Sequence, residues 1–294
     1  MGMTEWPVPS TPAGREGLAA LLVAPAEAVI AFDFDGTLAP IVPDPEQARA
    51  HPGAVPALCE LAPLVGAVVV ITGRPADVAV RYGGFADVPD LAHLTVLGQY
   101  GAERWEAGTG ELTAPPPPPG VAALRAELPA ALERAGARPG TWIEDKGRAL
   151  AVHTRRTPSP DAALDLLREP LARLAADHGL MVEPGRYVLE LRPPGVDKGT
   201  ALTAFLAERP AVGAVLYAGD DLGDLPAYAA VEKRRADGLP GLLVCSSGTV
   251  EGEPQVRELA DRADLLVPGP AGVVALLTEL ADRISSSGRS GPAR

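Results

Sequence analysis

Six short apolar runs, separated by stretches with helical spacing, organise most of the chain. The runs cover residues 28–32, 67–71, 94–97, 214–218, 242–245 and 265–267. A continuous apolar run of this length is typical of a strand buried on both faces of a parallel sheet. Helical patterns cover residues 53–64, 75–82, 199–207, 224–233 and 272–283. This alternation predicts an α/β fold with an open, doubly wound parallel sheet.

The middle of the chain interrupts that alternation and predicts an inserted α+β domain. Five consecutive prolines at 115–119 are expected to form a stiff, extended connector. The pattern that follows is helix, strand, strand, helix, strand, strand, and Pro170 is expected to disturb the second helix. The predicted organisation is a flexible N-terminus (1–15), a core domain (16–114 and 194–284), the inserted domain (115–193) and a disordered tail (285–294).

Composition and charge exclude several classes of partner. The formal net charge is −12, which argues against binding to nucleic acids and anionic membranes. Aromatic residues make up only 4% of the chain, and the two cysteines have neither metal-site nor disulfide spacing. No apolar stretch approaches the roughly 20 residues that span a bilayer. With no targeting pattern at the N-terminus, we expect a cytoplasmic protein.

Two acidic residues directly follow the first apolar run, 28–32. Asp33 and Asp35 are two residues apart, so on an extended chain their carboxylates point to the same side. Like charges that close need a cation or a proton between them. A surface turn is the alternative, because Asp35-Gly36 is also a common turn signal. A buried strand that runs directly into two acids favours an ion site.

A second acidic cluster, Asp220, Asp221 and Asp224, follows the run 214–218. Taken alone, it also fits a helix N-terminus, where aspartates serve as caps and complement the helix dipole. Together with the first pair it offers only oxygen ligands. Oxygen ligands favour Mg²⁺ over zinc, which prefers histidine or cysteine.

Further polar groups stand at another strand end and before a helix. Thr72, Gly73 and Arg74 follow the run 67–71 and supply a hydroxyl, a permissive backbone and a guanidinium. Arg74 can pair with a phosphate or with a neighbouring acid. Lys198 is one of three lysines in the chain and does not belong to a Walker A loop. In open α/β sheets, ligands bind beyond the carboxyl ends of the strands.

These elements, in this order, resemble the haloacid dehalogenase (HAD) superfamily of aspartate-nucleophile phosphohydrolases. The resemblance implies that Asp33 attacks phosphorus and forms an aspartyl-phosphate. Asp35 would protonate the leaving oxygen and then deprotonate the attacking water. Thr72 would hydrogen-bond the phosphoryl oxygens, and Lys198 would add positive charge.

The same resemblance implies a Mg²⁺ site. The ion would be held by Asp33, the backbone carbonyl of Asp35, and Asp220. Asp221 and Asp224 would be direct ligands or partners of ligands.

Five segments look like those of the trehalose-6-phosphate phosphatase family, namely 97–103, 144–146, 151–155, 190–199 and 219–224. The likeness runs from about residue 29 to residue 267. It implies that the insert is a cap that closes over a disaccharide and excludes water. The substrate-binding residues that it implies are Gly73, Arg74, Glu144, Lys146, Arg155, Arg186 and Glu190.

Two positions depart from the family pattern. Thr72 stands where the family more often has serine, and Tyr100 precedes Gly101 where the family commonly has a His-Gly pair. Both Ser and Thr supply one hydroxyl, so the role of position 72 is retained. For His153, a role in strand packing is the alternative to a role in the site.

The sequence therefore predicts a Mg²⁺-dependent phosphatase that converts trehalose 6-phosphate to trehalose and phosphate. Another sugar-phosphate phosphatase or a phosphomutase of the same superfamily is the alternative. A non-catalytic sugar-phosphate sensor would be expected to lack an essential acid, whereas Asp33, Asp35 and Asp220 are all present. The expected partner is the small-molecule substrate, and a trehalose-6-phosphate synthase is a candidate protein partner.

Overall fold

The chain forms two compact units, each with its own hydrophobic core. The computed structural model describes residues 8–42, 44–185, 187–209, 211–247 and 254–289. The core unit comprises Met1–Ala114 and Asp197–Arg294, and the cap unit comprises Pro115–Val196. Separate clusters of buried apolar side chains lie in the two units.

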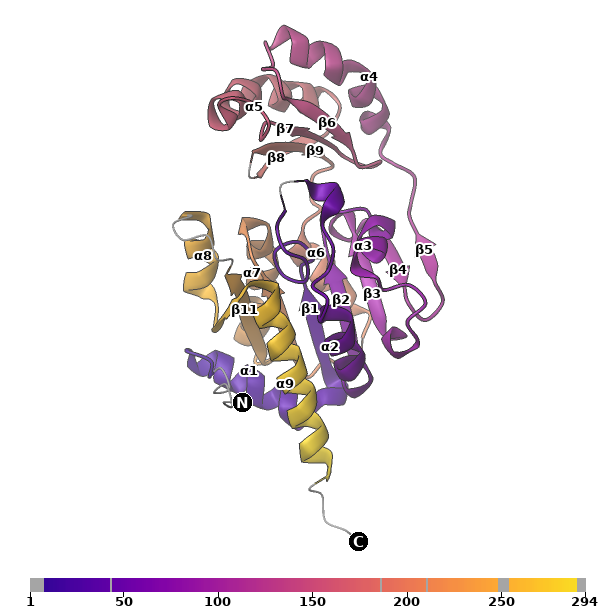
Figure 1. Ribbon diagram of the computed structural model, residues 1–294, viewed down its shortest axis with the longest axis vertical. Coiled ribbons are helices and arrows are strands. Elements are labelled where there is room, and N and C mark those ends of the chain that lie inside the picture. Colours follow the sequence, from indigo (N-terminus) through magenta and orange to yellow (C-terminus); the bar gives the residue numbers. More distant parts are fainter. Residues whose placement is uncertain (1–7, 43, 186, 210, 248–253, 290–294) are drawn as a thin grey trace. The chain divides into compact units, whose positions relative to one another are not determined.

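An open sheet forms the centre of the core unit (Figure 1), in the order β12-β11-β10-β1-β2-β3-β4-β5. Its strands are β1 (Ala28–Phe32), β2 (Ala67–Ile71), β3 (Leu94–Gly98), β4 (Glu103–Glu106), β5 (Glu111–Thr113), β10 (Ala214–Gly219), β11 (Gly241–Ser247) and β12 (Leu265–Pro268). From β12 to β3, neighbouring strands run parallel. Every residue of β1 and β2 is buried, which explains their continuous apolar runs. The predicted α/β fold with a parallel sheet is confirmed.

The hairpin β4–β5 adds an antiparallel edge that the apolar pattern does not predict. Its sequence is mostly polar, and Trp105 is the residue of β4 that is buried. Residues of β5 are exposed, so the hairpin has no continuous apolar run to signal it. A mixed sheet with an antiparallel edge is common among large α/β sheets.

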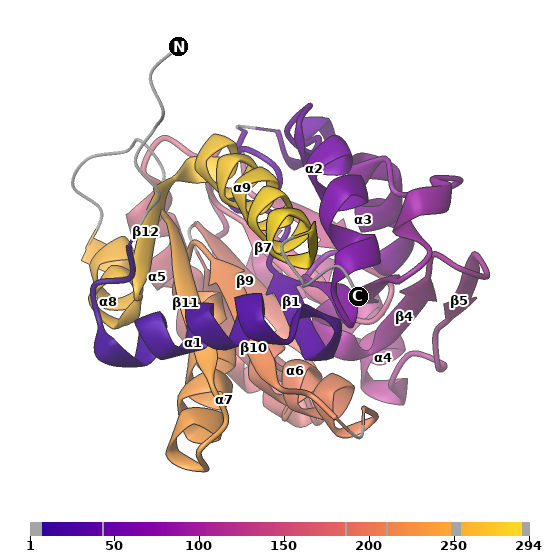
Figure 2. The same ribbon diagram turned by 90° about the horizontal axis from the view of Figure 1, so that it is seen from below.

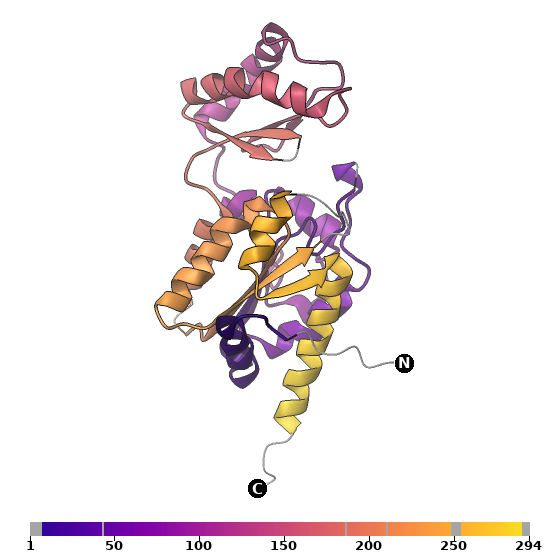
Figure 3. The same ribbon diagram turned by 90° about the vertical axis from the view of Figure 1, so that its left-hand side faces the viewer.

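Helices cover both faces of the sheet (Figures 2 and 3). The helices of the core unit are α1 (Pro12–Val23), α2 (Ala54–Leu61), α3 (Ala76–Gly83), α6 (Lys198–Ala207), α7 (Leu225–Ala236), α8 (Pro254–Arg262) and α9 (Gly269–Arg289). Side chains of α1, α2, α3 and α9 share one apolar cluster, and side chains of α6, α7 and α8 share another. Figure 3 shows the orange helices α6 and α7 and the yellow helix α9 on opposite faces of the sheet, and Figure 2 shows α9 and α2 together on one face.

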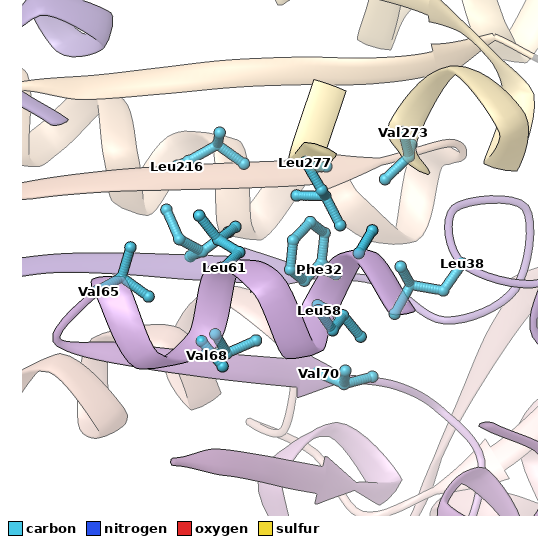
Figure 4. Close-up of a cluster of buried hydrophobic side chains, with 14 of the residues drawn as sticks. Phe32, Leu38, Leu58, Leu61, Val65, Val68, Val70, Leu216, Val273 and Leu277 are labelled. Carbon is cyan, nitrogen blue, oxygen red and sulfur yellow. The ribbon is translucent and has the colours of Figure 1, made fainter. Parts of the chain in front are cut away.

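The end of β1 is fixed by packing on its α2/α9 face (Figure 4). Phe32 is fully buried, and its ring lies between Leu58 of α2 and Leu277 of α9. Close-packed protein interiors resist displacement of a single side chain. The backbone that leads into Asp33 is therefore held rigidly.

The cap unit is a small α+β domain in which α4 and α5 lie on one face of an antiparallel sheet (Figure 1). The sheet order is β6-β7-β9-β8. The elements are α4 (Pro119–Arg134), β6 (Trp142–Asp145), β7 (Leu150–His153), α5 (Pro160–Asp177), β8 (Met181–Gly185) and β9 (Val188–Arg192). Leu150, Val152, Leu189 and Leu191 point into the helical layer. Alternate residues of the strands therefore form the opposite face, which the helices of this unit do not cover.

Three helical segments differ from the expectations. α5 runs through Pro170 without ending, because Leu167 and Leu171 anchor both sides of the proline in the cap core. α1 begins at Pro12, within the segment expected to be flexible, and Thr11 caps it by accepting from the Gly14 N–H. α9 continues to Arg289, past the expected start of the disordered tail at 285. Within the part of the chain that the structure describes, we find no helix that is both long enough and apolar enough to cross a membrane.

Candidate active site

Polar residues gather where three adjacent parallel strands end. β10, β1 and β2 are neighbours in the sheet, and Asp220, Asp33 and Thr72 are the residues that follow them. The Asp33 N–H donates to the Ala218 carbonyl oxygen at 2.9 Å, so the ladder extends as far as the first acid. The parallel topology thus brings together residues that are far apart in sequence, as the pattern of strand ends indicates.

A tight turn follows Asp33 and depends on glycine. Gly36 has a φ of +76°, and a Cβ at this position would lie 1.9 Å from Oδ2 of Asp220. The Gly36 carbonyl oxygen accepts a hydrogen bond from the buried Ser246 hydroxyl at 2.7 Å. Ser246, at the end of β11, is a supporting residue that the sequence does not single out. Its hydrogen bond fixes the turn against the sheet.

A buried ion-pair network links the first acid to the second cluster. Nζ of Lys198 lies 2.9 Å from Oδ1 of Asp33 and 2.7 Å from Oδ1 of Asp224. The Tyr217 hydroxyl donates to the same Asp224 oxygen at 2.6 Å. Lys198 starts α6, where Asp197 caps the helix. Lys198 therefore bridges the two predicted clusters, and Tyr217 is a second supporting residue that sequence reasoning missed.

Asp224 also shapes the loop that carries Asp220. Its Oδ2 accepts from the Asp220 N–H at 2.9 Å and from the Asp221 N–H at 3.2 Å. The Asp221 carboxylate accepts from the Gly223 N–H at 2.8 Å. Asp224 therefore holds the loop in place, and Asp221 caps the short turn that follows it.

Three of the predicted metal ligands converge. Among the described residues, carboxylate oxygens of Asp33, Asp220 and Asp224 lie within 4.8 Å of one another. The carboxylates of Asp35 and Asp221 are not in this group. Because both oxygens of Asp224 already have partners, Asp33 and Asp220 are the better candidates for direct contact with a cation.

The electrostatics of the cluster call for added positive charge. Burial raises the pKa of Asp33 to about 8, with Lys198 opposing the shift and Asp224 adding to it. Burial, followed by the charges of Asp221 and Asp33, raises the pKa of Asp220 well above its ordinary value. Burial lowers the pKa of Lys198, but Asp224 and Asp33 outweigh it and raise that pKa overall. One ammonium does not neutralise these acids, so a proton or a cation is needed for all of them to remain close.

The segment after β2 carries a bidentate ion pair. Nε and Nη2 of Arg74 donate to the two Asp35 oxygens at 2.6 and 2.7 Å, and Nη1 donates to the Pro45 carbonyl. The buried Thr72 hydroxyl oxygen accepts from the Arg74 N–H at 3.1 Å. Arg74 was expected to bind substrate; in this structure it holds Asp35.

A strained turn supports this segment from β3. Gln99 and Tyr100 both have positive φ angles, 49° and 57°. Their N–H groups donate to the Arg74 and Thr72 carbonyl oxygens at 2.8 and 2.9 Å. Gly73 gives the Tyr100 ring room, because a Cβ at position 73 would lie 2.7 Å from the Tyr100 hydroxyl oxygen and the ring would have to shift. Strain of this kind persists only where surrounding contacts enforce it, often at functional sites.

The cap residues lie on the face of the cap sheet opposite the helices. Lys146 Nζ lies 2.7 Å from Oε2 of Glu190, and Glu144 Oε2 lies 2.8 Å from Nε2 of His153. Glu190 is buried, and its Oε1 has no hydrogen-bond partner among the described residues. A buried carboxylate oxygen in that state is suited to accept from a ligand hydroxyl.

Two arginines, Arg155 and Arg186, are the remaining predicted cap residues. Arg155 is half-buried in the turn after β7. Arg186 lies outside the described residues, so its predicted contact with sugar stays a prediction.

The core unit has a HAD-like α/β fold, which it shares with solved structures. A solved HAD-like hydrolase from Bacteroides thetaiotaomicron covers 86% of this chain and 99% of its own, with a TM-score of 0.55 and 16% identity. The C-terminal domain of Candida albicans trehalose-6-phosphate phosphatase covers 95% of this chain and 99% of its own, with a TM-score of 0.70 and 21% identity. At these identities the two structures show the shared fold alone.

Sequence comparison identifies the family. The trehalose-phosphatase family model matches residues 31–259. Trehalose-6-phosphate phosphatase of Escherichia coli K12 is 31% identical over 209 residues, which are 69% of this chain and 73% of that protein. The chain belongs to the trehalose-phosphatase family and is a phosphoric monoester hydrolase.

Proposed function

We propose that the protein hydrolyses trehalose 6-phosphate to trehalose and phosphate, with Asp33 as the nucleophile. One observation carries the proposal: Asp33 lies at the end of a buried strand, paired with Lys198 and next to Asp220. The family match and the relative that acts on trehalose 6-phosphate support the choice of substrate.

In the proposed first step, an Asp33 carboxylate oxygen bonds to phosphorus, and the bond from phosphorus to the sugar oxygen breaks. Asp35 gives its proton to the departing oxygen. In the second step, Asp35 takes a proton from water, the water oxygen bonds to phosphorus, and the Asp33–phosphorus bond breaks. Because Arg74 now holds both Asp35 oxygens, this exchange requires the pair to open when the phosphate arrives.

The neighbouring groups stabilise charge on the transferring phosphoryl group. We propose that the Lys198 ammonium, which pairs with Asp33, also adds positive charge beside the phosphoryl oxygens. We propose that the Thr72 hydroxyl donates to one of those oxygens and that Gly73 and Arg74 bind the phosphate. Preorganised donors of this kind stabilise a transition state without reorganising during the reaction.

The residues present fit a bound Mg²⁺ ion. The donors are hard oxygens, and burial together with the neighbouring carboxylates raises the pKa of Asp33 and of Asp220, which supports a cation at this cluster. We propose that Asp33, Asp220 and the Asp35 backbone carbonyl hold the ion, with Asp224 orienting the loop. When bound, Mg²⁺ would neutralise charge on the phosphoryl oxygens.

The cap unit would select the sugar. Glu144, Lys146 and Glu190 present carboxylates and an ammonium on the face without helices, where they can bond hydroxyls. We propose Arg155 and Arg186 as further contacts on the basis of the family likeness. Charged groups that bond several hydroxyls discriminate strongly, because a wrong ligand leaves them unpaired.

The test is phosphate release from a panel of sugar phosphates with Mg²⁺ present. We expect kcat/KM for trehalose 6-phosphate to exceed that for glucose 6-phosphate, sucrose 6-phosphate and mannosyl phosphates by about tenfold or more. Equal or faster turnover of another member of the panel would assign a different sugar-phosphate phosphatase. Isomerisation of a sugar phosphate that depends on a bisphosphate would indicate a phosphomutase.

A further inference from the structure

We propose that His153 is a positioning residue that orients the Glu144 carboxylate for sugar hydroxyls, and that Trp142 and Arg156 hold its imidazole in place. The inference rests on the proposed function, in which Glu144 contacts the sugar. It assigns roles to three residues of the cap unit that the chemistry of phosphate transfer does not involve.

Four side chains of the cap unit contact one another in series: Arg156, Trp142, His153 and Glu144. The indole of Trp142 and the imidazole of His153 have centroids 4.4 Å apart and planes 7° apart. The guanidinium carbon of Arg156 lies 4.4 Å from the Trp142 ring centroid. At the other end, Nε2 of His153 lies 2.8 Å from Oε2 of Glu144. A carboxylate only accepts hydrogen bonds, so Nε2 carries the proton and donates.

Strand pairing places this stack on the face without helices. Trp142 pairs with His153, and Glu144 pairs with Ala151, across the antiparallel β6–β7 ladder. Residues directly opposite each other in such a ladder share a face. Ala151 in turn pairs with Glu190, so the two glutamates belong to the same face. His153 therefore acts on the face that carries the proposed sugar contacts.

The contacts of Trp142 fit a support for His153 better than a platform for sugar. His153 packs in parallel against its ring, and Arg156 lies over the ring at stacking distance. An aromatic ring that binds sugar presents an open face, whereas His153 and Arg156 occupy ring surface of Trp142 that a sugar would need. Parallel stacking also fixes the plane of the imidazole, and hence the direction of its Nε2–H.

Burial constrains the Glu144 side chain less than that of Glu190. Its side chain is 39% exposed, against 7% for Glu190. Glu190 is already fixed by burial and by Lys146, whereas an exposed carboxylate samples several rotamers in water. A hydrogen bond from a rigid ring restricts those rotamers before substrate binds, as outer partners do for metal ligands.

A double-mutant cycle on the full-length enzyme tests the proposal. The variants are His153→Phe, which keeps a ring for the stack and removes the donor, Glu144→Gln, and both together. We expect His153→Phe to lower kcat/KM for trehalose 6-phosphate about tenfold. The variant should leave kcat/KM for a small aryl phosphate unchanged, so the ratio of the two kcat/KM values falls by the same factor. The double variant should be no slower than Glu144→Gln, because His153 acts through Glu144.

Two further variants separate positioning from general stability. Trp142→Phe should stay within about twofold of wild type, whereas Trp142→Leu should reproduce the loss seen with His153→Phe. His178→Phe is the matched control: His178 also lies near a glutamate of the cap, Glu127, at 3.3 Å, but at the helical layer. It should leave the substrate ratio unchanged.

The outcomes distinguish the two proposals. If wild type shows no preference for trehalose 6-phosphate over glucose 6-phosphate, the proposed function fails before any variant is measured. If wild type has the preference, either of two results overturns the positioning role. One is that the losses of kcat/KM from His153→Phe and Glu144→Gln multiply in the double variant. The other is that His153→Phe lowers kcat/KM for the aryl phosphate as much as for trehalose 6-phosphate.

Discussion

At the scale of single residues, the central feature is one lysine shared between two buried acids. Lys198 pairs with Asp33 and Asp224, and Asp224 also accepts from Tyr217. Removing one member of a buried pair typically costs about 3–5 kcal/mol, because the partner is left uncompensated. Burial nevertheless raises the pKa of Asp33 and of Asp220, so keeping both acids ionised costs stability unless a cation lies between them.

This imbalance predicts how pH and Mg²⁺ affect stability together. Burial raises the pKa of Asp33 from 3.8 to about 8, with Lys198 opposing and Asp224 adding to the shift. Between these pH values the folded state holds a proton that the unfolded state has lost, so metal-free stability falls as pH rises from about 4 to about 8. Because Mg²⁺ competes with that proton, the rise in Tm on adding Mg²⁺ should be larger at pH 8 than at pH 5.5, by about 3 °C or more.

Thermal unfolding at the two pH values, with and without Mg²⁺, measures this difference. Asp33→Asn serves as the control, since it removes one titrating group and should weaken the dependence on pH, leaving the part that comes from Asp220. An equal rise in Tm at both pH values would contradict a coupling between the proton and the cation.

At the scale of elements, the apolar runs predicted the strands well because strands buried on both faces leave no polar positions. β1 and β2 occupy the predicted residues, and Asp33 and Thr72 stand at the predicted edge. The polar hairpin β4–β5 has no such run, and α5 outlasts Pro170 because tertiary packing overrides local preference. Ser246 and Tyr217 were missed because their roles depend on register across strands, and for His153 the sequence left strand packing and a role in the site open.

The turn after β1 yields a prediction with a matched control. Gly36 and Gly84 have similar positive φ angles, 76° and 68°, so alanine at either should cost about 1 kcal/mol of backbone strain. A Cβ at Gly36 would also strike the Asp220 carboxylate, whereas at Gly84 it meets nothing within 4 Å. We expect Gly36→Ala to lower kcat by about 100-fold and to abolish stabilisation by Mg²⁺. Gly84→Ala should lose stability only; similar kinetics in both variants would show that Asp220 is not displaced.

At the scale of the molecule, two units with separate cores carry different groups of the predicted site residues. The core unit holds the acids and Lys198, and the cap unit holds Glu144, Lys146 and Glu190. The proline run and the change in pattern indicated the insert. The pairing of cap residues could not be predicted, because it requires knowing which strands are neighbours.

Separate cores predict that each unit can be weakened by itself. Leu171 and Leu277 are fully buried, in the cap unit and the core unit respectively. Replacing either by alanine should cost about 2–5 kcal/mol. By amide hydrogen exchange, Leu171→Ala should speed exchange in the cap unit alone, and Leu277→Ala should do so in the core unit. Uniform acceleration in both variants would mean that the units unfold as one.

The most direct measurement is chemical trapping of the phosphorylated enzyme during turnover. Borohydride added to enzyme that is hydrolysing trehalose 6-phosphate with Mg²⁺ should reduce an acyl phosphate at Asp33 to homoserine, which peptide mass spectrometry locates. We predict this change at position 33, and its absence, together with loss of turnover, in Asp33→Asn. An enzyme that turns over with position 33 unmodified, or that is modified at a different acid, would contradict the nucleophilic role of Asp33.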